Sequence, residues 1–247
     1  MPATFAQRML LLVLLMSVAA NISSIQERIA AAASRAYRRP EDIALMAVTK
    51  THSPQQIREA YAAGIHLFGE NRVQEFAGKA TALADLEAAE WHMIGHLQTN
   101  KAGKAAELFS AVDSVDSVKL AEKLDAGARN LGKKLNVLIE INVGGEAAKS
   151  GVMPDSPGLE DLLLAAPRFE ALEFRGLMTV PPFTDDPQAA RPYFLNLREL
   201  RDTIAARHVP RIGLDVLSMG MSHDFEVAVE EGSTCVRVGT AIFGGRK

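Results

Sequence analysis

Short apolar runs rich in β-branched residues alternate with helical stretches along almost the whole chain. The runs that we predict as strands cover residues 43–49, 66–69, 91–94, 109–115, 136–143, 173–180, 214–219 and 234–238. Helical patterns lie between them, at 54–63, 73–88, 101–108, 117–131, 159–166, 186–207 and 223–231. Strands that alternate with helices pair in parallel, because each helix carries the chain back to the start of the next strand. Eight such units predict an α/β fold with a single (β/α)8 TIM barrel, and 247 residues suffice for one.

A doubly wound open sheet is the alternative architecture. Its dinucleotide-binding form carries a Gly-x-Gly-x-x-Gly motif after the first strand, and no such motif stands there. The stretch 95–102 resembles a phosphate-binding P-loop, but it lacks the second Gly and the Ser or Thr after Lys101. The barrel therefore remains the favoured prediction.

Charge and cysteine content exclude several classes of protein. The net charge is −3, from 27 basic and 30 acidic residues without a long run of either sign, so we expect no nucleic-acid partner. A single cysteine, Cys235, excludes an intrachain disulfide and the usual zinc sites. His92 and His96 have a spacing that binds metal on a helix, but they fall in and just after a predicted strand, so no metal site is expected.

The N-terminal segment 1–20 is predicted to be an extension outside the domain, which then covers 21–247. Its uncharged run 9–20 is shorter than the roughly 20 residues that span a bilayer, so stable membrane insertion is not expected. Arg8 and the small residues Ser17 and Ala19 fit a secretory signal, whereas a translation start at Met16 would make 1–15 irrelevant to the fold. We favour the second interpretation and expect a cytoplasmic protein.

The first helix is expected to follow that segment directly. Ile22, Ile25 and Ile29 fall on one helical face, and Asn21 or Ser23 is available as the N-cap.

Lys50 ends the first predicted strand, at the end of the barrel where the chemistry of this fold takes place. One interpretation is a lysine whose amine simply reaches out of the barrel mouth to water. The other is a Schiff-base lysine, since an amine in a partly desolvated site is more often neutral and can attack an aldehyde.

The segments after the last two strands contain small and hydroxyl residues. Ser218, Gly220 and Ser222 follow one strand, and Gly239 and Thr240 follow the other. They can be ordinary turns, but loops at these two positions form the usual phosphate site of a TIM barrel, and glycines let backbone N–H groups approach an anion.

Arg237 lies in the last predicted strand and alternates with Val236 and Val238, so its side chain is expected to point into the barrel. A buried guanidinium needs an acceptor, and Glu70 or Glu140 could supply one. Lys50 on the first strand, Arg237 on the last and a phosphate site between them would hold a phosphorylated aromatic aldehyde at both of its ends. Pyridoxal 5′-phosphate (PLP) has that shape. An arginine near the pyridine nitrogen would weaken the ring as an electron sink and so disfavour transamination.

Nine motifs together resemble the pyridoxal phosphate homeostasis protein family. The resemblance spans about residues 22–245, and its motifs are AVTK (47–50), FGEN (68–71), VQE (73–75), WHMIGHLQTNK (91–101), NVLIEIN (136–142), KSG (149–151), RGLM (175–178), LSMGMS (217–222) and VRVGTAIFG (236–244). The first motif often reads VSKTK in the family, so Thr49 keeps the hydroxyl while His52 makes the site entrance less positive.

The resemblance implies a barrel like the N-terminal domain of bacterial alanine racemase, with PLP held as a Schiff base on Lys50. It further implies that Arg237 faces the pyridine nitrogen. The remaining cofactor-binding residues that it implies are Asn71, Ser218, Met219, Ser222, Gly239 and Thr240. Members of the family are regarded as non-catalytic regulators of intracellular PLP and of the balance of amino and keto acids.

Two functions from different classes fit these residues. The first is a non-catalytic, monomeric PLP carrier or regulator that hands the cofactor to apo PLP-dependent enzymes. The second is a PLP-dependent amino-acid racemase, which needs a second acid or base opposite the lysine. Alanine racemases take a tyrosine for this from an added β-domain, whereas Tyr37, Tyr61 and Tyr193 fall in predicted helices or connections and the chain ends at Lys247. We therefore favour the carrier; a barrel that binds another phosphorylated metabolite is a third possibility.

Overall fold

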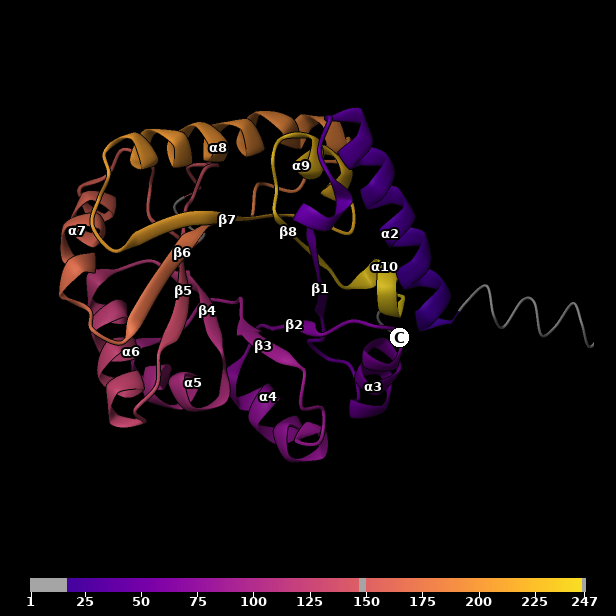
Figure 1. The fold of residues 1–247 in the computed structure, drawn as a ribbon, viewed down its shortest axis with the longest axis horizontal. Helices are drawn as coiled ribbons and strands as arrows, with labels where there is room; N and C mark the ends of the chain where they lie inside the picture. Colours follow the sequence, from indigo (N-terminus) through magenta and orange to yellow (C-terminus); the bar gives the residue numbers. More distant parts are fainter. Residues whose placement is uncertain (1–16, 147–149, 246–247) are drawn as a thin grey trace, which may run out of the picture.

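Eight parallel strands close into a barrel in the order in which they occur along the chain (Figure 1). The computed structural model describes residues 17–146 and 150–245. The strands are β1 (Ala44–Val48), β2 (Leu67–Glu70), β3 (Glu90–Met93), β4 (Ala111–Val115), β5 (Leu135–Glu140), β6 (Leu172–Met178), β7 (Ile212–Met221) and β8 (Cys235–Val238). The prediction of a single (β/α)8 barrel is confirmed, and the open-sheet alternative is wrong.

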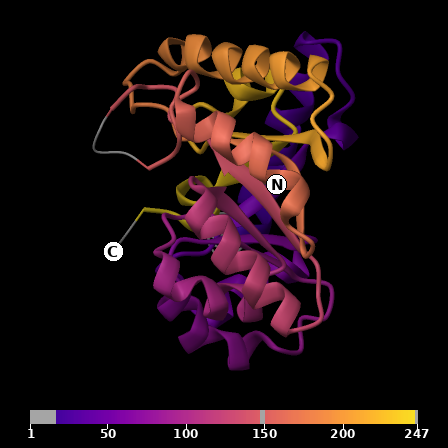
Figure 2. The same ribbon diagram turned by 90° about the vertical axis from the view of Figure 1, so that its left-hand side faces the viewer.

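Helices follow the strands and lie outside the barrel (Figures 1 and 2). They are α2 (Val18–Arg35), α3 (Pro54–Ala62), α4 (Val73–Ala80), α5 (Ala102–Leu108), α6 (Val118–Asn130), α7 (Pro157–Ala165), α8 (Arg191–Ala206), α9 (Phe225–Glu230) and α10 (Thr240–Phe243). Within 17–146 and 150–245, none combines the length and the apolar character that a membrane crossing needs.

Helix α2 begins earlier than expected. Its N-cap is Ser17, whose Oγ accepts a hydrogen bond from the Ala20 amide at 3.1 Å, and not Asn21 or Ser23. Asn21 lies inside the helix and donates from Nδ2 to the carbonyl of Ile242 at 2.8 Å, which ties α2 to α10. Of the segment 1–20, residues 1–16, with Arg8 and the favoured start at Met16, lie outside the described residues, whereas Ser17 and Ala19, the small residues of the alternative signal, belong to the N-cap and first turn of α2.

Two other boundaries differ for local reasons. The helix expected over 73–88 ends at Ala80, and a 3-10 turn (Thr81–Leu83) follows. In this turn the Ala82 carbonyl accepts a hydrogen bond from Arg58 Nη2 at 2.6 Å. The strand expected to reach Val143 ends at Glu140, because the chain beyond it pairs with Val152.

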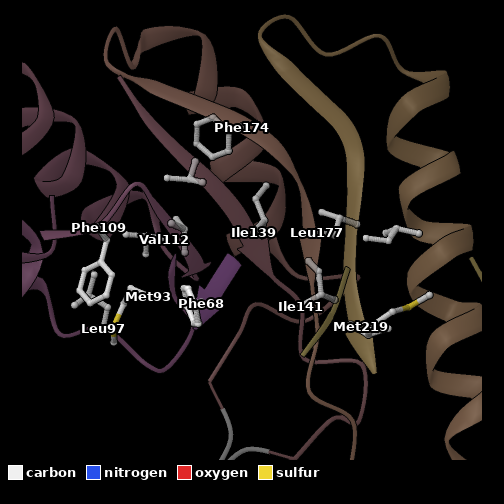
Figure 3. Close-up of a cluster of buried hydrophobic side chains, with 14 of the residues drawn as sticks. Phe68, Met93, Leu97, Phe109, Val112, Ile139, Ile141, Phe174, Leu177 and Met219 are labelled. Carbon is white, nitrogen blue, oxygen red and sulfur yellow. The ribbon is translucent and has the colours of Figure 1, made fainter. Parts of the chain in front are cut away.

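Apolar side chains fill the space between the strands and the helices (Figure 3). Phe68, Phe109 and Phe174 are among the side chains buried there. Close packing extends to the backbone at Gly176, where a Cβ atom would lie 1.9 Å from the Val216 carbonyl oxygen. The barrel is therefore a rigid frame for the loops at its rim.

We expect the single cysteine to be unreactive in the folded protein. Cys235 is buried in β8, and this burial raises the pKa of its thiol to about 12. Because the thiolate is the nucleophile, Ellman's reagent is expected to label Cys235 only after unfolding in urea. Rapid stoichiometric labelling of the native protein would contradict this prediction.

Candidate functional site

The rim at the carboxyl ends of β1, β7 and β8 encloses a cavity of about 240 Å³. We call it the β1/β8 pocket. It brings together five of the predicted site residues, which are Lys50, Ser222, Arg237, Gly239 and Thr240. These residues come from opposite ends of the sequence, and they meet because β8 pairs with β1 and closes the barrel.

Lys50 follows β1 and is held through both of its neighbours in the chain. The Thr49 carbonyl accepts a hydrogen bond from Lys79 Nζ at 3.1 Å, and the Thr51 amide donates to Glu75 Oε1 at 2.5 Å. Thr51 has a φ of +65°, a left-handed conformation that is uncommon outside glycine. The backbone at Lys50 is thus fixed from both sides at the entrance of the β1/β8 pocket.

A buried ion pair stands behind this backbone. Glu70 is 0% exposed at the end of β2, and its Oε1 accepts from Lys79 Nζ at 2.7 Å and from Thr49 Oγ1 at 2.6 Å. Burial raises the pKa of the Glu70 carboxyl, and the bonds from Lys79 and Thr49 act against that rise. Lys79 also lies 3.1 Å from Glu75 Oε1, so one ammonium joins the two carboxylates that flank Lys50.

Arg237 points into the barrel, as the alternation in β8 predicted, and is 3% exposed. Its hydrogen-bond acceptors are uncharged: Nη1 donates to Ser218 Oγ at 2.6 Å and Nη2 donates to the Thr179 carbonyl at 2.7 Å. The expectation of a hydrogen-bonded pair with Glu70 or Glu140 is therefore wrong. Glu70 pairs with Lys79, and Glu140 attracts Arg237 electrostatically without a hydrogen bond. Burial lowers the pKa of Arg237, but a guanidinium stays charged in proteins.

The loops after β7 and β8 turn backbone N–H groups toward one point. Ser222 Oγ accepts from the amides of Gly239 and Ala241, each at 3.3 Å. The turn is held by Asp224, which accepts from the Met221 amide at 2.6 Å. At Gly239 a Cβ atom would lie 3.3 Å from the Val48 side chain, so glycine keeps this backbone close to β1.

The other predicted residues lie elsewhere. Asn71 lines a second, larger cavity beside the β1/β8 pocket. Ser218 is fully buried behind Arg237, and Met219 belongs to the core (Figure 3). A role of these three residues toward a cofactor stays a prediction.

His52, which the sequence placed at the site entrance, lines the β1/β8 pocket, and so do Phe183 and His223, which sequence reasoning missed. The ring of Phe183 lies 5.5 Å from that of His223 and is 77% exposed, which is unusual for phenylalanine. A phenylalanine after two prolines, directly behind a strand end, was the available signal. Burial lowers the pKa of His52, so this ring adds no positive charge at neutral pH.

The second cavity encloses about 730 Å³ at the carboxyl ends of β2 to β6. We call it the β2/β6 pocket. Its charged lining includes Asp116 and Glu140, with His96 beside Asp116 at 3.6 Å. His92 instead bonds Asp113 at 3.1 Å, and the described residues contain no group of three potential metal ligands.

Comparison with known proteins identifies relatives over nearly the whole chain. The model of the alanine racemase N-terminal domain matches residues 20–247. The pyridoxal phosphate homeostasis protein of Aquifex aeolicus is 44% identical over 232 residues, which are 94% of this chain and 100% of that protein. The protein of the same name from Pseudomonas aeruginosa is 44% identical over 231 residues, 93% of this chain and 96% of its own.

Solved structures agree with the sequence comparison. The structure of PipY from Synechococcus elongatus with PLP bound has a TM-score of 0.78 and 36% identity, and the match covers 92% of this chain and 100% of that one. Alanine racemase from Streptomyces coelicolor has a TM-score of 0.67 at 22% identity and shares the fold, with 91% of this chain matched to 58% of the enzyme.

Proposed function

This chain belongs to the pyridoxal phosphate homeostasis protein family, and from that premise we propose that it binds PLP as a Schiff base on Lys50 and serves as a non-catalytic regulator of PLP supply. The observation that carries the proposal is the lining of the β1/β8 pocket, in which Lys50, the buried Arg237 and the hydroxyl residues Ser222 and Thr240 surround one cavity. The PLP-bound structure of PipY, a relative of similar length, supports the choice of cofactor.

The residues present fit the cofactor by the chemistry of their donors. The hydroxyls of Ser222 and Thr240 offer O–H groups to a phosphate, and the Gly239 and Ala241 amides, which donate to Ser222 Oγ, hold that hydroxyl in place. Lys50 is the one lysine in the described lining of the pocket, and the buried charge of Arg237 suits the pyridine nitrogen that it is proposed to face. When bound, PLP supplies an aldehyde that condenses with a primary amine and releases water.

The chain's own residues orient that chemistry. Glu75 and Lys79 hold the peptide groups on either side of Lys50, which keeps its side chain at the pocket entrance. Arg237 keeps its charge at the ring and thereby disfavours protonation of the pyridine nitrogen, so the ring is a weak electron sink. These features favour holding the cofactor over turning over amino acids.

The racemase alternative lacks a tyrosine base in the pocket. Tyr61 and Tyr193 lie in α3 and α8 and Tyr37 follows α2, and none of them lines the described part of the β1/β8 pocket.

We propose further that the protein acts in the cytoplasm as a monomer, keeps amino and keto acids in balance, and passes PLP to apo-enzymes. The names of its relatives, which refer to PLP homeostasis, support this role.

Borohydride trapping tests the proposal. Purified protein is mixed with PLP, reduced, digested and mapped by mass spectrometry, with Lys50→Ala treated in parallel. We expect a pyridoxyl adduct on the Lys50 peptide that is absent from the variant, and no racemisation of added amino acids. Adducts spread over surface lysines, or none, would contradict the binding mode, and racemisation that requires Lys50 would favour the enzyme.

Ser222→Ala is expected to weaken PLP binding by about two- to tenfold, because the pocket loses one hydroxyl donor and the loop loses the acceptor of the Gly239 and Ala241 amides. Fluorescence titration with PLP measures the change. Ser110→Ala, at the opposite end of the barrel in front of β4, is the matched control and is expected to bind as the wild type does. Equal affinities for Ser222→Ala and the wild type would remove Ser222 from the site.

A further inference from the structure

A buried carboxylate with an unused oxygen lines the β2/β6 pocket. Glu140, at the end of β5, is 6% exposed. Its Oε1 accepts a hydrogen bond from Ser150 Oγ at 2.8 Å, while its Oε2 is buried without a hydrogen-bond partner. A carboxylate oxygen that is withdrawn from water and left unpaired is costly, and such an atom in the wall of a cavity indicates a missing donor.

The charged side chains in the described lining of this pocket are carboxylates. Asp116 adds a second carboxylate near Glu140, and among the described residues that line this pocket none is lysine or arginine. Arg237 attracts Glu140 electrostatically, but both of its bonded nitrogens donate elsewhere, to Ser218 and Thr179. The described lining therefore presents two carboxylates to a ligand and no ammonium or guanidinium group.

The missing donor is best supplied by a positively charged nitrogen. A neutral donor would satisfy the oxygen but leave the charge of Glu140 uncompensated, whereas an N⁺–H···O⁻ bond does both. A metal ion would need more ligands than two carboxylates, and the described residues contain no group of three His, Cys, Asp or Glu side chains that could hold one. An anion would be repelled by Asp116 and Glu140.

We propose that the β2/β6 pocket is a binding site for small primary amines, which it holds by an ammonium group bonded to Glu140 Oε2, with Asp116 adding long-range attraction. Ile94, Ile141 and Val180 line the same cavity and give the short apolar part of such a ligand a surface to pack on. The site is separate from the β1/β8 pocket and does not require Lys50 or bound PLP.

Arg237 joins the two pockets. Its side chain lines the β1/β8 pocket, and its charge acts on Glu140 in the β2/β6 pocket. An ammonium at Glu140 places a second positive charge near the guanidinium, so occupied amine and cofactor sites are expected to influence each other.

Calorimetric titration of n-butylamine into the PLP-free full-length protein tests the site, because without PLP no aldehyde is present that could condense with the amine. We expect saturable binding that Glu140→Gln weakens by about ten- to a hundredfold, since the substitution keeps the shape and removes the charge. Asp116→Asn is expected to weaken it by a smaller factor, and n-butanol, the neutral analogue, is expected not to saturate.

Glu87→Gln, an exposed carboxylate on the outside of the barrel, is the matched control and should leave the affinity unchanged. Circular dichroism during thermal unfolding checks that Glu140→Gln is folded. The proposal is overturned if the wild type shows no saturable binding, if Glu140→Gln and Asp116→Asn bind butylamine as the wild type does, or if butanol binds equally well. Because Lys50 is untouched in these variants, failure here leaves the PLP-trapping experiment unaffected.

Discussion

The Lys79→Met variant is expected to unfold with a free energy lower than that of the wild type by about 3–5 kcal/mol at neutral pH. Lys79 Nζ is 2.7 Å from Glu70 Oε1, and Glu70 is fully buried. Methionine fills a similar volume but leaves the carboxylate buried without its cation. Urea denaturation followed by circular dichroism measures the difference, and a loss below about 1 kcal/mol, the value of an exposed pair, would contradict it.

The stability loss of Lys79→Met is expected to become smaller as the pH falls. Burial raises the pKa of Glu70 above its ordinary value, and Lys79 opposes that rise. A carboxyl whose pKa is higher in the folded than in the unfolded state lowers stability above its unfolded pKa, and the loss is relieved as the pH falls through the folded pKa. Without Lys79 that pKa rises further, so the variant should regain stability relative to the wild type between about pH 7 and pH 4.

The double variant Lys79→Met, Glu70→Gln is the control for this mechanism. It removes the charge as well as its partner, so we expect most of the lost stability to return and the pH dependence to disappear. The Lys50 backbone would still lack the donor to the Thr49 carbonyl. The double variant should therefore trap PLP on Lys50 more slowly than the wild type even though it is stable.

Arg237→Met is expected to lower the free energy of unfolding by about 2–4 kcal/mol and the affinity for PLP by at least about tenfold. The guanidinium is buried, serves both Ser218 and the Thr179 carbonyl, and is attracted by the carboxylates of Asp113 and Asp224. Removing it leaves those groups without a donor or a counter-charge. Urea denaturation and PLP titration of the same variant measure the two effects.

Ser218→Ala separates the hydrogen bond from the charge. It removes one acceptor of Arg237 and is expected to cost only about 1 kcal/mol. A cost for Arg237→Met no larger than for Ser218→Ala would show that the buried charge contributes little.

The alternation of strands and helices was enough to predict the barrel, because its eightfold count and parallel pairing follow from local patterns. It also placed Lys50, Ser222, Arg237 and Gly239 at one rim, since every parallel strand ends there. It did not predict the acceptors of Arg237, because these depend on the register of β8 with the neighbouring β7, which carries Ser218, and on where the chain after β6 places the Thr179 carbonyl.

Bulges in the pairing of these strands explain the difficulty. The register shifts between Ser218 and Met221, where β7 meets β8, and no periodic pattern in the sequence marks such a shift. The same limit applies to the N-cap at Ser17 and to the pocket lining supplied by Phe183, since both lie in segments without a repeating pattern.

Because β1 pairs with β8, the β1/β8 pocket forms only after the whole barrel has been synthesised. Ala44 pairs with Cys235 and Ala47 with Val238, so the sheet becomes continuous only when the last strand joins the first. A ribosome-bound chain that has not yet released β8 has Lys50 but lacks Arg237, Gly239 and Thr240. In the proposed binding mode PLP would bind only closed barrels, and by mass action it would stabilise the closure of the ring.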